Sequence, residues 1–226
     1  MARPRVPLLS AEKIAKEALD QVDAHGDFSI PDIARSLRVS PSSIYHHLEG
    51  RAGILNGIRS LMNSRLVEEM AGGTASDPQS TTENDVPWQE EVRRWSASYT
   101  LALAKHPLAL PLIIREPVTD EPTLQIYESL ATTLARAGFR EDQALVAVSM
   151  LENLSFGAAM DACSPPTPWK ADHERHPKLH AAVASVQPSE RQTRAFQYSL
   201  NALIRQLELL LTGTDGNPEA GPTPPR

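Results

Sequence analysis

A cluster of hydroxyl, phenol and imidazole side chains stands near the N-terminus of the 226-residue chain. Its members are Ser42, Ser43, Tyr45, His46 and His47. These groups donate and accept hydrogen bonds, and on a helix in the major groove of DNA they can approach the edges of base pairs. Arg51 follows shortly after them, and a cation at that point can contact a phosphate. The cluster therefore predicts a surface that reads DNA.

Two short helices joined by a tight turn are expected to position this cluster. Ser29 caps the first helix, which has Pro31 in its first turn, and Ser40 with Pro41 begins the second. The apolar positions that would form their shared core are Ile33, Ala34, Leu37, Val39, Ile44 and Leu48. This pattern predicts a helix-turn-helix. A further helix is expected before it, from Ser10 to Gly26, and a long one after Gly50.

Residues 8–60 resemble the DNA-binding domain of the tetracycline-repressor (TetR) family. The residues that follow the family pattern VSxxxLYxHVxxKxxLL are Ser40, Ile44, Tyr45, His47, Leu48, Arg51, Ile54 and Leu55. The resemblance implies that Ser42, Ser43, Tyr45, His46 and His47 face DNA and that Arg51 contacts a phosphate. Arg38 departs from the pattern, because glycine usually holds that turn position. Pro31 departs as well, because a polar or basic phosphate contact is common there.

Helical periodicity continues through the rest of the chain, and no strand pattern of useful length appears. We expect helices at 88–105, 122–137, 141–162 and 188–211, a short apolar helix or turn near 108–117, and at most one short helix within 164–187. The predicted fold is therefore all-α. It has an N-terminal three-helix DNA-binding domain at 1–58, a helical bundle at 59–212 and a flexible tail at 213–226. The polar, aperiodic residues 71–87 predict a mobile linker or loop.

The helices after Trp88 resemble the C-terminal domain of the same family. That resemblance implies a homodimer that binds a palindromic double-stranded DNA operator and responds to a small hydrophobic effector, most commonly by releasing the DNA. The candidate effector contacts are Trp95, Tyr99, Leu103, His106, Ile113, Tyr127, Leu130, Met150, Asn153 and Phe156. The candidate dimer-interface residues are Leu145, Val148, Leu200, Ile204, Leu207 and Leu211. The alternative for both sets is an ordinary place in the core of one subunit.

Composition excludes several other classes of protein. The chain carries 22 Lys and Arg against 28 Asp and Glu, which argues against a generally basic protein that coats nucleic acid. Cys163 is the single cysteine, so neither an intrachain disulfide nor a cysteine-based zinc cluster can form. No apolar run approaches the ~20 residues that span a bilayer, and no secretion signal is recognisable, so we expect a cytoplasmic protein without a membrane partner. Phosphate-binding loops and hydrolase or metalloprotease motifs are missing, which favours a non-enzymatic protein without a cofactor.

One segment leaves a different function open. His173, His176 and His180 are spaced three and four residues apart, which would suit a metal site on one helix face, although Pro177 interrupts them. The alternative to a DNA-binding regulator is therefore a helical protein that binds a small molecule or a metal and has no DNA function. The two hypotheses predict different results for Tyr45→Ala. The substitution removes specific DNA binding if the protein is a DNA-binding regulator, and it has no effect if the protein has no DNA function.

Overall fold

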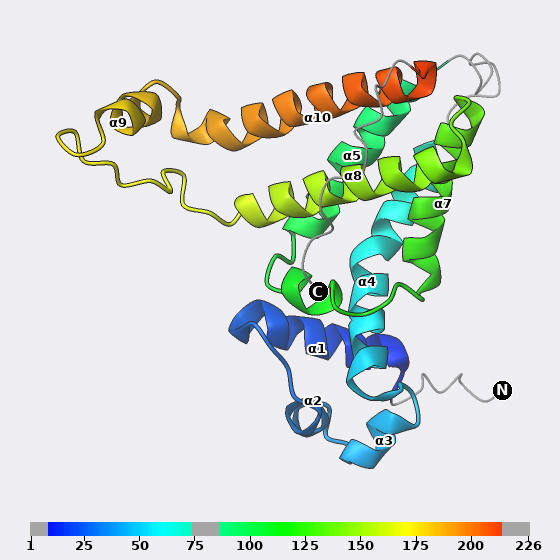
Figure 1. The fold of residues 1–226 in the computed structure, drawn as a ribbon. Coiled ribbons are helices and arrows are strands. Elements are labelled where there is room, and N and C mark those ends of the chain that lie inside the picture. The colour runs from blue at the N-terminus through cyan, green and yellow to red at the C-terminus, as the bar shows by residue number, and fades with distance from the viewer. Residues whose placement is uncertain (1–8, 74–85, 214–226) are drawn as a thin grey trace, which may run out of the picture.

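The computed structural model describes residues 9–73 and 86–213, and all regular structure in those two ranges is helical (Figure 1). The all-α prediction is therefore confirmed. Most of the predicted linker at 71–87, and all of the predicted tail except Gly213, lie outside the described residues. In the described parts, no helix is both long enough and apolar enough to cross a membrane.

Three short helices and the first part of a long one form the N-terminal unit. They are α1 (Ala11–His25), α2 (Ile30–Leu37), α3 (Pro41–Tyr45) and α4 (Gly50–Gly73). Serine side chains cap the first three helices: Ser10 Oγ accepts from Lys13 N at 3.2 Å, and Ser29 and Ser40 act in the same way. Gly26, in the left-handed region with φ of 79°, ends α1. The predicted serine caps and the predicted helix end at Gly26 are therefore present in the structure.

The remaining helices form the C-terminal bundle, here called the body. They are α5 (Trp88–Ala104), α6 (Leu110–Ile113), α7 (Glu121–Arg136), α8 (Glu141–Asp161), α9 (Pro177–Ala184) and α10 (Pro188–Thr212). The helices α8 and α10 lie side by side and antiparallel (Figure 1). The helix α4 runs without a break from the N-terminal unit into the body, where it packs against α5, α6 and α7. The predicted domain boundary at residue 58 thus falls inside one helix.

The crossing of α1 over α4 is close. Gly57 of α4 faces Ala15 of α1, and a Cβ at position 57 would lie 2.9 Å from the Ala15 Cβ. Around this crossing Ile14, Ala18, Ile54 and Ile58 are fully buried. Because the two helix backbones approach so closely, the N-terminal unit is fixed to the N-terminal half of α4 (Figure 1).

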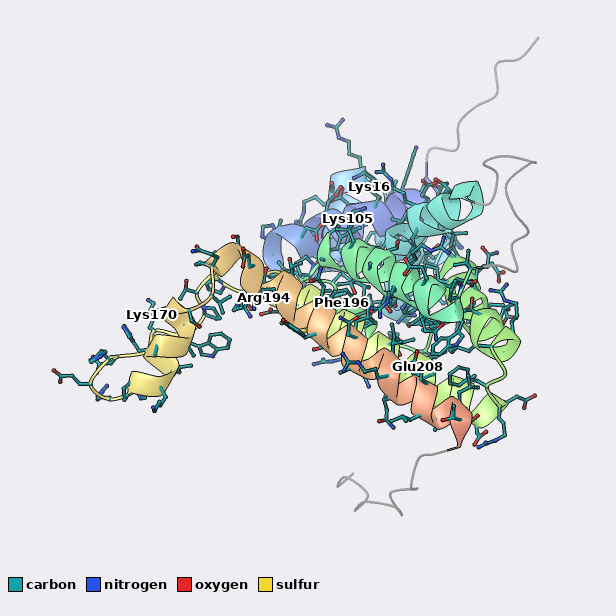
Figure 2. All side chains as sticks on the ribbon, turned by 90° about the horizontal axis from the view of Figure 1, so that it is seen from above. Lys16, Lys105, Lys170, Arg194, Phe196 and Glu208 are labelled. Atoms are coloured by element: carbon teal, nitrogen blue, oxygen red, sulfur yellow. The ribbon has the colours of Figure 1, made fainter. Side chains whose placement is uncertain are left out.

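Residues 163–187, here called the arm, leave the body between α8 and α10. The arm carries α9, in which no residue is buried. Figure 2 shows it extending, with Lys170, beyond the first turns of α10 at Arg194. Near its base, the Arg191 guanidinium pairs with both carboxylate oxygens of Asp161 at 3.0 Å and lies 5.3 Å from the centre of the Trp169 ring. The base of the arm is therefore tied to the body, while α9 itself has no core.

Candidate functional site

The helix α3 lies at the end of the molecule opposite α10 (Figure 1). Tyr45 is 58% exposed, and Ser42, His46 and His47 are exposed as well. Its opposite face buries Ile44 completely. The α-helical part ends at Tyr45, so His46 and His47 follow in the turn that leads to α4. Four of the five predicted reading residues are thus open to solvent, whereas Ser43 is half-buried.

The serines of α3 share a hydrogen-bond network. The Ser40 hydroxyl lies 2.8 Å from the hydroxyls of both Ser42 and Ser43. It also accepts from the Ser43 backbone N–H at 3.3 Å. This network holds the first turn of α3 in a defined conformation, which a reading helix of one and a half turns needs.

The turn between α2 and α3 is made by Arg38 instead of glycine. Its backbone has φ of 57° and ψ of 43°, which is the left-handed region. Within the turn, the N–H of Val39 donates to the Ala34 carbonyl at 3.0 Å. The left-handed turn therefore forms with a residue other than glycine, at a steric cost of about 1 kcal/mol. The Arg38 side chain is exposed and, within residues 27–51, is the one arginine without an ion pair. It is a second candidate for a phosphate contact, which the sequence reasoning did not name.

Arg51 is held inside the N-terminal unit. Its guanidinium donates to Asp27 Oδ1 at 2.5 Å and to the Phe28 carbonyl at 3.0 Å, and it lies 4.4 Å from the centre of the Phe28 ring. The hydrogen bond from Arg51 holds the pKa of the Asp27 carboxyl below its usual range. Because the side chain is still 44% exposed, one face of the guanidinium remains open to a phosphate. In the structure its defined contact is with the loop between α1 and α2.

Four aromatic rings from α5, α7 and α8 meet inside the body. The Tyr99 ring lies 4.9 Å from Trp95, 6.0 Å from Tyr127 and 6.4 Å from Phe156, measured between ring centres. Trp95 is fixed by a hydrogen bond of 3.0 Å from its indole N–H to the Ile126 carbonyl. These four residues, here called the aromatic cluster, are all among the predicted effector contacts.

A chain of hydroxyl groups crosses the aromatic cluster and ends on a carboxylate. The hydroxyls of Tyr99 and Tyr127 are 3.0 Å apart, and the Tyr127 hydroxyl donates to Glu152 Oε1 at 2.5 Å. Burial raises the pKa of both tyrosines above their usual range, and the Glu152 charge adds to this effect. Both phenols therefore stay protonated. Glu152 was not predicted from the sequence, although a charged residue inside the apolar segment 141–162 was a signal for it.

The other predicted effector contacts are dispersed. Leu103, Ile113 and Leu130 are buried in the continuous core, whereas Met150 is only half-buried against it. His106 lies at the contact between the body and α1, where its Nδ1 is 2.7 Å from Asp23 Oδ2. Asn153 is exposed and lines a separate groove between α5, α8 and α10.

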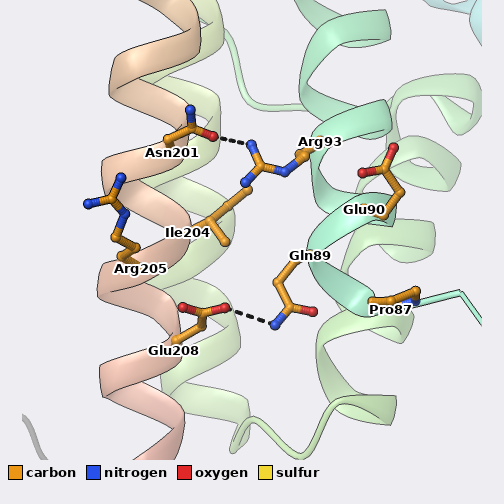
Figure 3. Close-up of a pocket in the computed structure, with 8 residues that line it drawn as sticks. All are labelled: Pro87, Gln89, Glu90, Arg93, Asn201, Ile204, Arg205 and Glu208. Carbon is orange, nitrogen blue, oxygen red and sulfur yellow. Dashed lines mark hydrogen bonds between the residues drawn. The ribbon is translucent and has the colours of Figure 1, made fainter.

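Two surface cavities lie on the α10 side of the body. The groove between α5, α8 and α10 has a volume of about 540 Å³ and is lined mainly by small apolar residues. A second cavity, of about 620 Å³, lies between α5 and α10 and is polar (Figure 3). Across it, Arg93 donates to Asn201, and Gln89 donates to Glu208 at 2.9 Å. Neither cavity is lined by a ring of the aromatic cluster.

Arg59 connects α4 to the segment between α6 and α7. Although charged, it is only 4% exposed. Its guanidinium donates to the backbone carbonyls of Ile113, Glu116 (2.8 Å) and Pro117 (3.0 Å), and it lies 3.8 Å from the Asp120 carboxylate. One turn further along α4, Asn63 donates to Thr123 Oγ1 at 2.8 Å. This polar junction joins the helix that leaves the N-terminal unit to the corner of the body next to the aromatic cluster.

The predicted interface residues divide into two groups. Leu200, Ile204 and Leu207 are 4%, 2% and 0% exposed in the single subunit, so they belong to its own core, which was the alternative left open. Val148 and Leu211 are half-buried, and Leu145 is 68% exposed. The exposed apolar side chains of α8 and α10 are Leu145, Val146, Met160, Tyr198 and Leu209. Sequence periodicity located the helices, and the interface role of the half-buried and exposed residues stays a prediction.

Two of the three histidines of the arm lie against each other. The rings of His173 and His180 are 5.4 Å apart, and His180 Nδ1 lies 3.0 Å from the Ala171 carbonyl. Within the described residues, no group of three or more metal-ligating side chains is placed to hold an ion.

Comparison with known proteins identifies the family. Residues 80–211 match the model of the tetracyclin repressor-like C-terminal domain. No curated protein matches at a significant level. Among solved structures, a possible TetR family transcriptional regulator from Streptomyces coelicolor A3(2) covers 89% of this chain and 100% of its own, with a TM-score of 0.66 and 20% identity.

Two further structures are similar in fold and contain a small molecule. The S. coelicolor TetR family protein ActR, in complex with actinorhodin, has a TM-score of 0.68 at 17% identity, and the match covers 90% of this chain and 97% of ActR. A TetR variant from Acinetobacter baumannii AYE, in complex with minocycline, has a TM-score of 0.59 at 18% identity, covering 90% and 98%. With the family model matching more than half of its length, the chain belongs to the tetracycline repressor-like (TetR) family of transcriptional regulators.

Proposed function

We propose that the chain is a ligand-responsive repressor that binds a palindromic operator as a homodimer and releases it when an effector binds in the body. The observation that carries the proposal is the open polar face of α3, which is held away from the body on a capped and tightly packed unit. As a non-enzymatic regulator of this kind it would act in the cytoplasm, where its operator is. Residues 9–58 would form the reading head, and the described residues from 59 onward the sensor.

Reading would occur through Ser42, Tyr45, His46 and His47, with the major groove receiving α3. Arg38 and the open face of Arg51 would contact phosphates on either side. A single head makes few base contacts, so two heads related by the two-fold axis of a dimer are needed for useful affinity. This is the reason to expect a palindrome.

The exposed apolar residues of α8 and α10 support a dimer through this face. Two antiparallel helices from each subunit would form a four-helix bundle, which is a common arrangement for dimerisation. The arm supports the same view, because α9 has no core of its own in one subunit. We expect the purified protein to sediment as a dimer and Leu145→Asp to make it monomeric and unable to bind specific DNA.

The aromatic cluster supports an effector site between α5, α7 and α8. Pockets for small molecules are mostly apolar with a few polar groups that orient the ligand, and the cluster has this composition. The ActR and TetR structures were solved with actinorhodin and minocycline respectively, and we infer that this chain also responds to a small organic molecule. The polar junction around Arg59 would transmit the change to α4 and so to the spacing of the two heads.

The test is fluorescence anisotropy with duplexes enriched from a random pool by the purified protein. We expect a palindromic consensus, and a steep loss of affinity as salt rises because phosphate contacts release counterions. A protein that enriches no sequence over several rounds, while remaining folded and dimeric, would contradict the proposed DNA function.

A further inference from the structure

The aromatic cluster holds a large share of the aromatic residues of a chain that has few. The whole sequence contains 3 Trp, 4 Tyr and 4 Phe, and four of these side chains meet around Tyr99. The face of an aromatic ring is electrically negative and attracts a cation placed over it. A site walled by several such rings therefore favours cations over anions of the same size.

A carboxylate adds to this preference. Glu152 is half-buried beside the cluster, and its one polar contact in the structure is the hydroxyl of Tyr127. Within the described ranges, no lysine, arginine or histidine forms an ion pair with it. Glu91, Asp120 and Asp161 of the same body each pair with an arginine. The Glu152 charge is thus not compensated by a protein cation.

Neighbouring charges do not cancel this one. The guanidinium of Arg59, whose charge acts on Tyr99, is already bound to three carbonyls and lies beside Asp120. Arg59 and Asp120 together are neutral, so Glu152 leaves the site with one net negative charge. A bound cation would remove the cost of keeping this carboxylate partly out of water.

The side chains of the site differ in how far they are buried. Trp95 and Tyr99 are 6% and 2% exposed and form the floor. Tyr127, Glu152 and Phe156 are only half-buried and form the rim, on α7 and α8. An aryl-bearing molecule would have to displace the half-buried Phe156 to reach the buried rings, and its charge would then lie near the Glu152 carboxylate.

We propose that the effector site binds a lipophilic cation, with aryl groups against the aromatic cluster and the positive charge at Glu152. This rests on the proposed function, since it specifies the chemical class of the effector. Glu152 supplies the charge and selects against anions, while Tyr127 orients the carboxylate through its hydroxyl. The free oxygen, Glu152 Oε2, remains available to the ligand.

The direct test compares two probes of nearly equal size and opposite charge, tetraphenylphosphonium and tetraphenylborate, by isothermal titration calorimetry on the full-length protein. We expect saturable binding of tetraphenylphosphonium, at least about tenfold tighter than that of tetraphenylborate. Glu152→Gln should reduce this preference to within about threefold. The variant keeps the acceptor for Tyr127, so its melting temperature should stay near that of the unsubstituted protein.

The matched control is Glu128→Gln, which removes the same charge from an exposed position on α7; it should leave the preference unchanged. Equal affinity for both probes, equal effects of the two substitutions, or no binding of either probe would each overturn the cationic class. Saturable binding of both probes alike would still leave the effector site of the proposed function standing.

A separate measurement keeps the two proposals apart. Operator affinity is recorded by anisotropy with and without tetraphenylphosphonium. Binding of the cation together with at least tenfold weaker operator binding supports both proposals. Binding of the cation with unchanged operator affinity supports the ligand class and contradicts the sensing part of the proposed function.

Discussion

Replacing Arg59 by methionine tests the junction between α4 and the body. The guanidinium is almost completely buried and donates to three backbone carbonyls and to Asn56 Oδ1. Methionine fills much of the same space but donates nothing, so these acceptors and Asp120 lose their partner. Removing one side of a buried charged contact typically costs about 3–5 kcal/mol. For a chain of this size we expect the melting temperature to fall by about 10–15 °C.

The assay is thermal and urea unfolding at one fixed protein concentration, because the stability of a dimer depends on concentration. Arg94→Met is the matched control, since Arg94 is exposed on α5, and we expect a change within about 0.5 kcal/mol. A double-mutant cycle with Asp120→Asn should give a coupling energy of at least about 1 kcal/mol. If Arg59→Met is as stable as Arg94→Met, the buried junction does not hold the two parts together as the structure indicates.

Three further substitutions have defined outcomes. Gly57→Ala should destabilise the chain by about 1–2 kcal/mol in urea unfolding, because the 2.9 Å approach to Ala15 outweighs the better helix propensity of alanine; an increase in stability would contradict this. Arg38→Gly should raise stability by up to about 1 kcal/mol by relieving the left-handed backbone, and should weaken DNA binding if Arg38 contacts a phosphate. The Asp27–Arg51 pair stabilises the fold at neutral pH, because the folded state lowers the pKa of Asp27; this contribution should disappear as the pH falls through that lowered value. In the Asp27→Asn variant, the free energy of unfolding should therefore fall less steeply as the pH is lowered. An unchanged pH dependence would show that the pair contributes little.

Local signals were enough to predict the N-terminal unit. Serine caps, Pro31 and Pro41 in first turns, and Gly26 at a helix end act through neighbouring backbone groups, so the sequence contains the whole interaction. The same holds for Gly138, which ends α7 with φ of 97° and places the buried Phe139 against Trp88. The sequence did not predict the backbone conformation of Arg38, and the structure shows that this residue adopts the left-handed conformation.

Contacts between distant helices were less predictable. The four rings of the aromatic cluster are all among the residues predicted to line an apolar pocket with a few polar groups, but His106 is in the same predicted set and instead contacts Asp23 of α1. The roles of Arg59 and Glu152 depend on which helices lie beside them, and this is set by tertiary packing. For α10, an amphipathic stripe has the same pattern whether it faces its own subunit or a partner, so periodicity alone did not distinguish the two.

The central claim is that α3 reads DNA, and Tyr45 is the residue that tests it most directly. It is 58% exposed, so its replacement by alanine should leave folding and dimerisation intact. Leu124→Ala, at a 43% exposed position on α7, is the control. We expect anisotropy with the enriched palindrome to show at least about a tenfold loss of specific affinity for Tyr45→Ala and no change for Leu124→Ala. Equal affinity of the two variants for the palindrome would contradict the assignment of α3 as the reading helix.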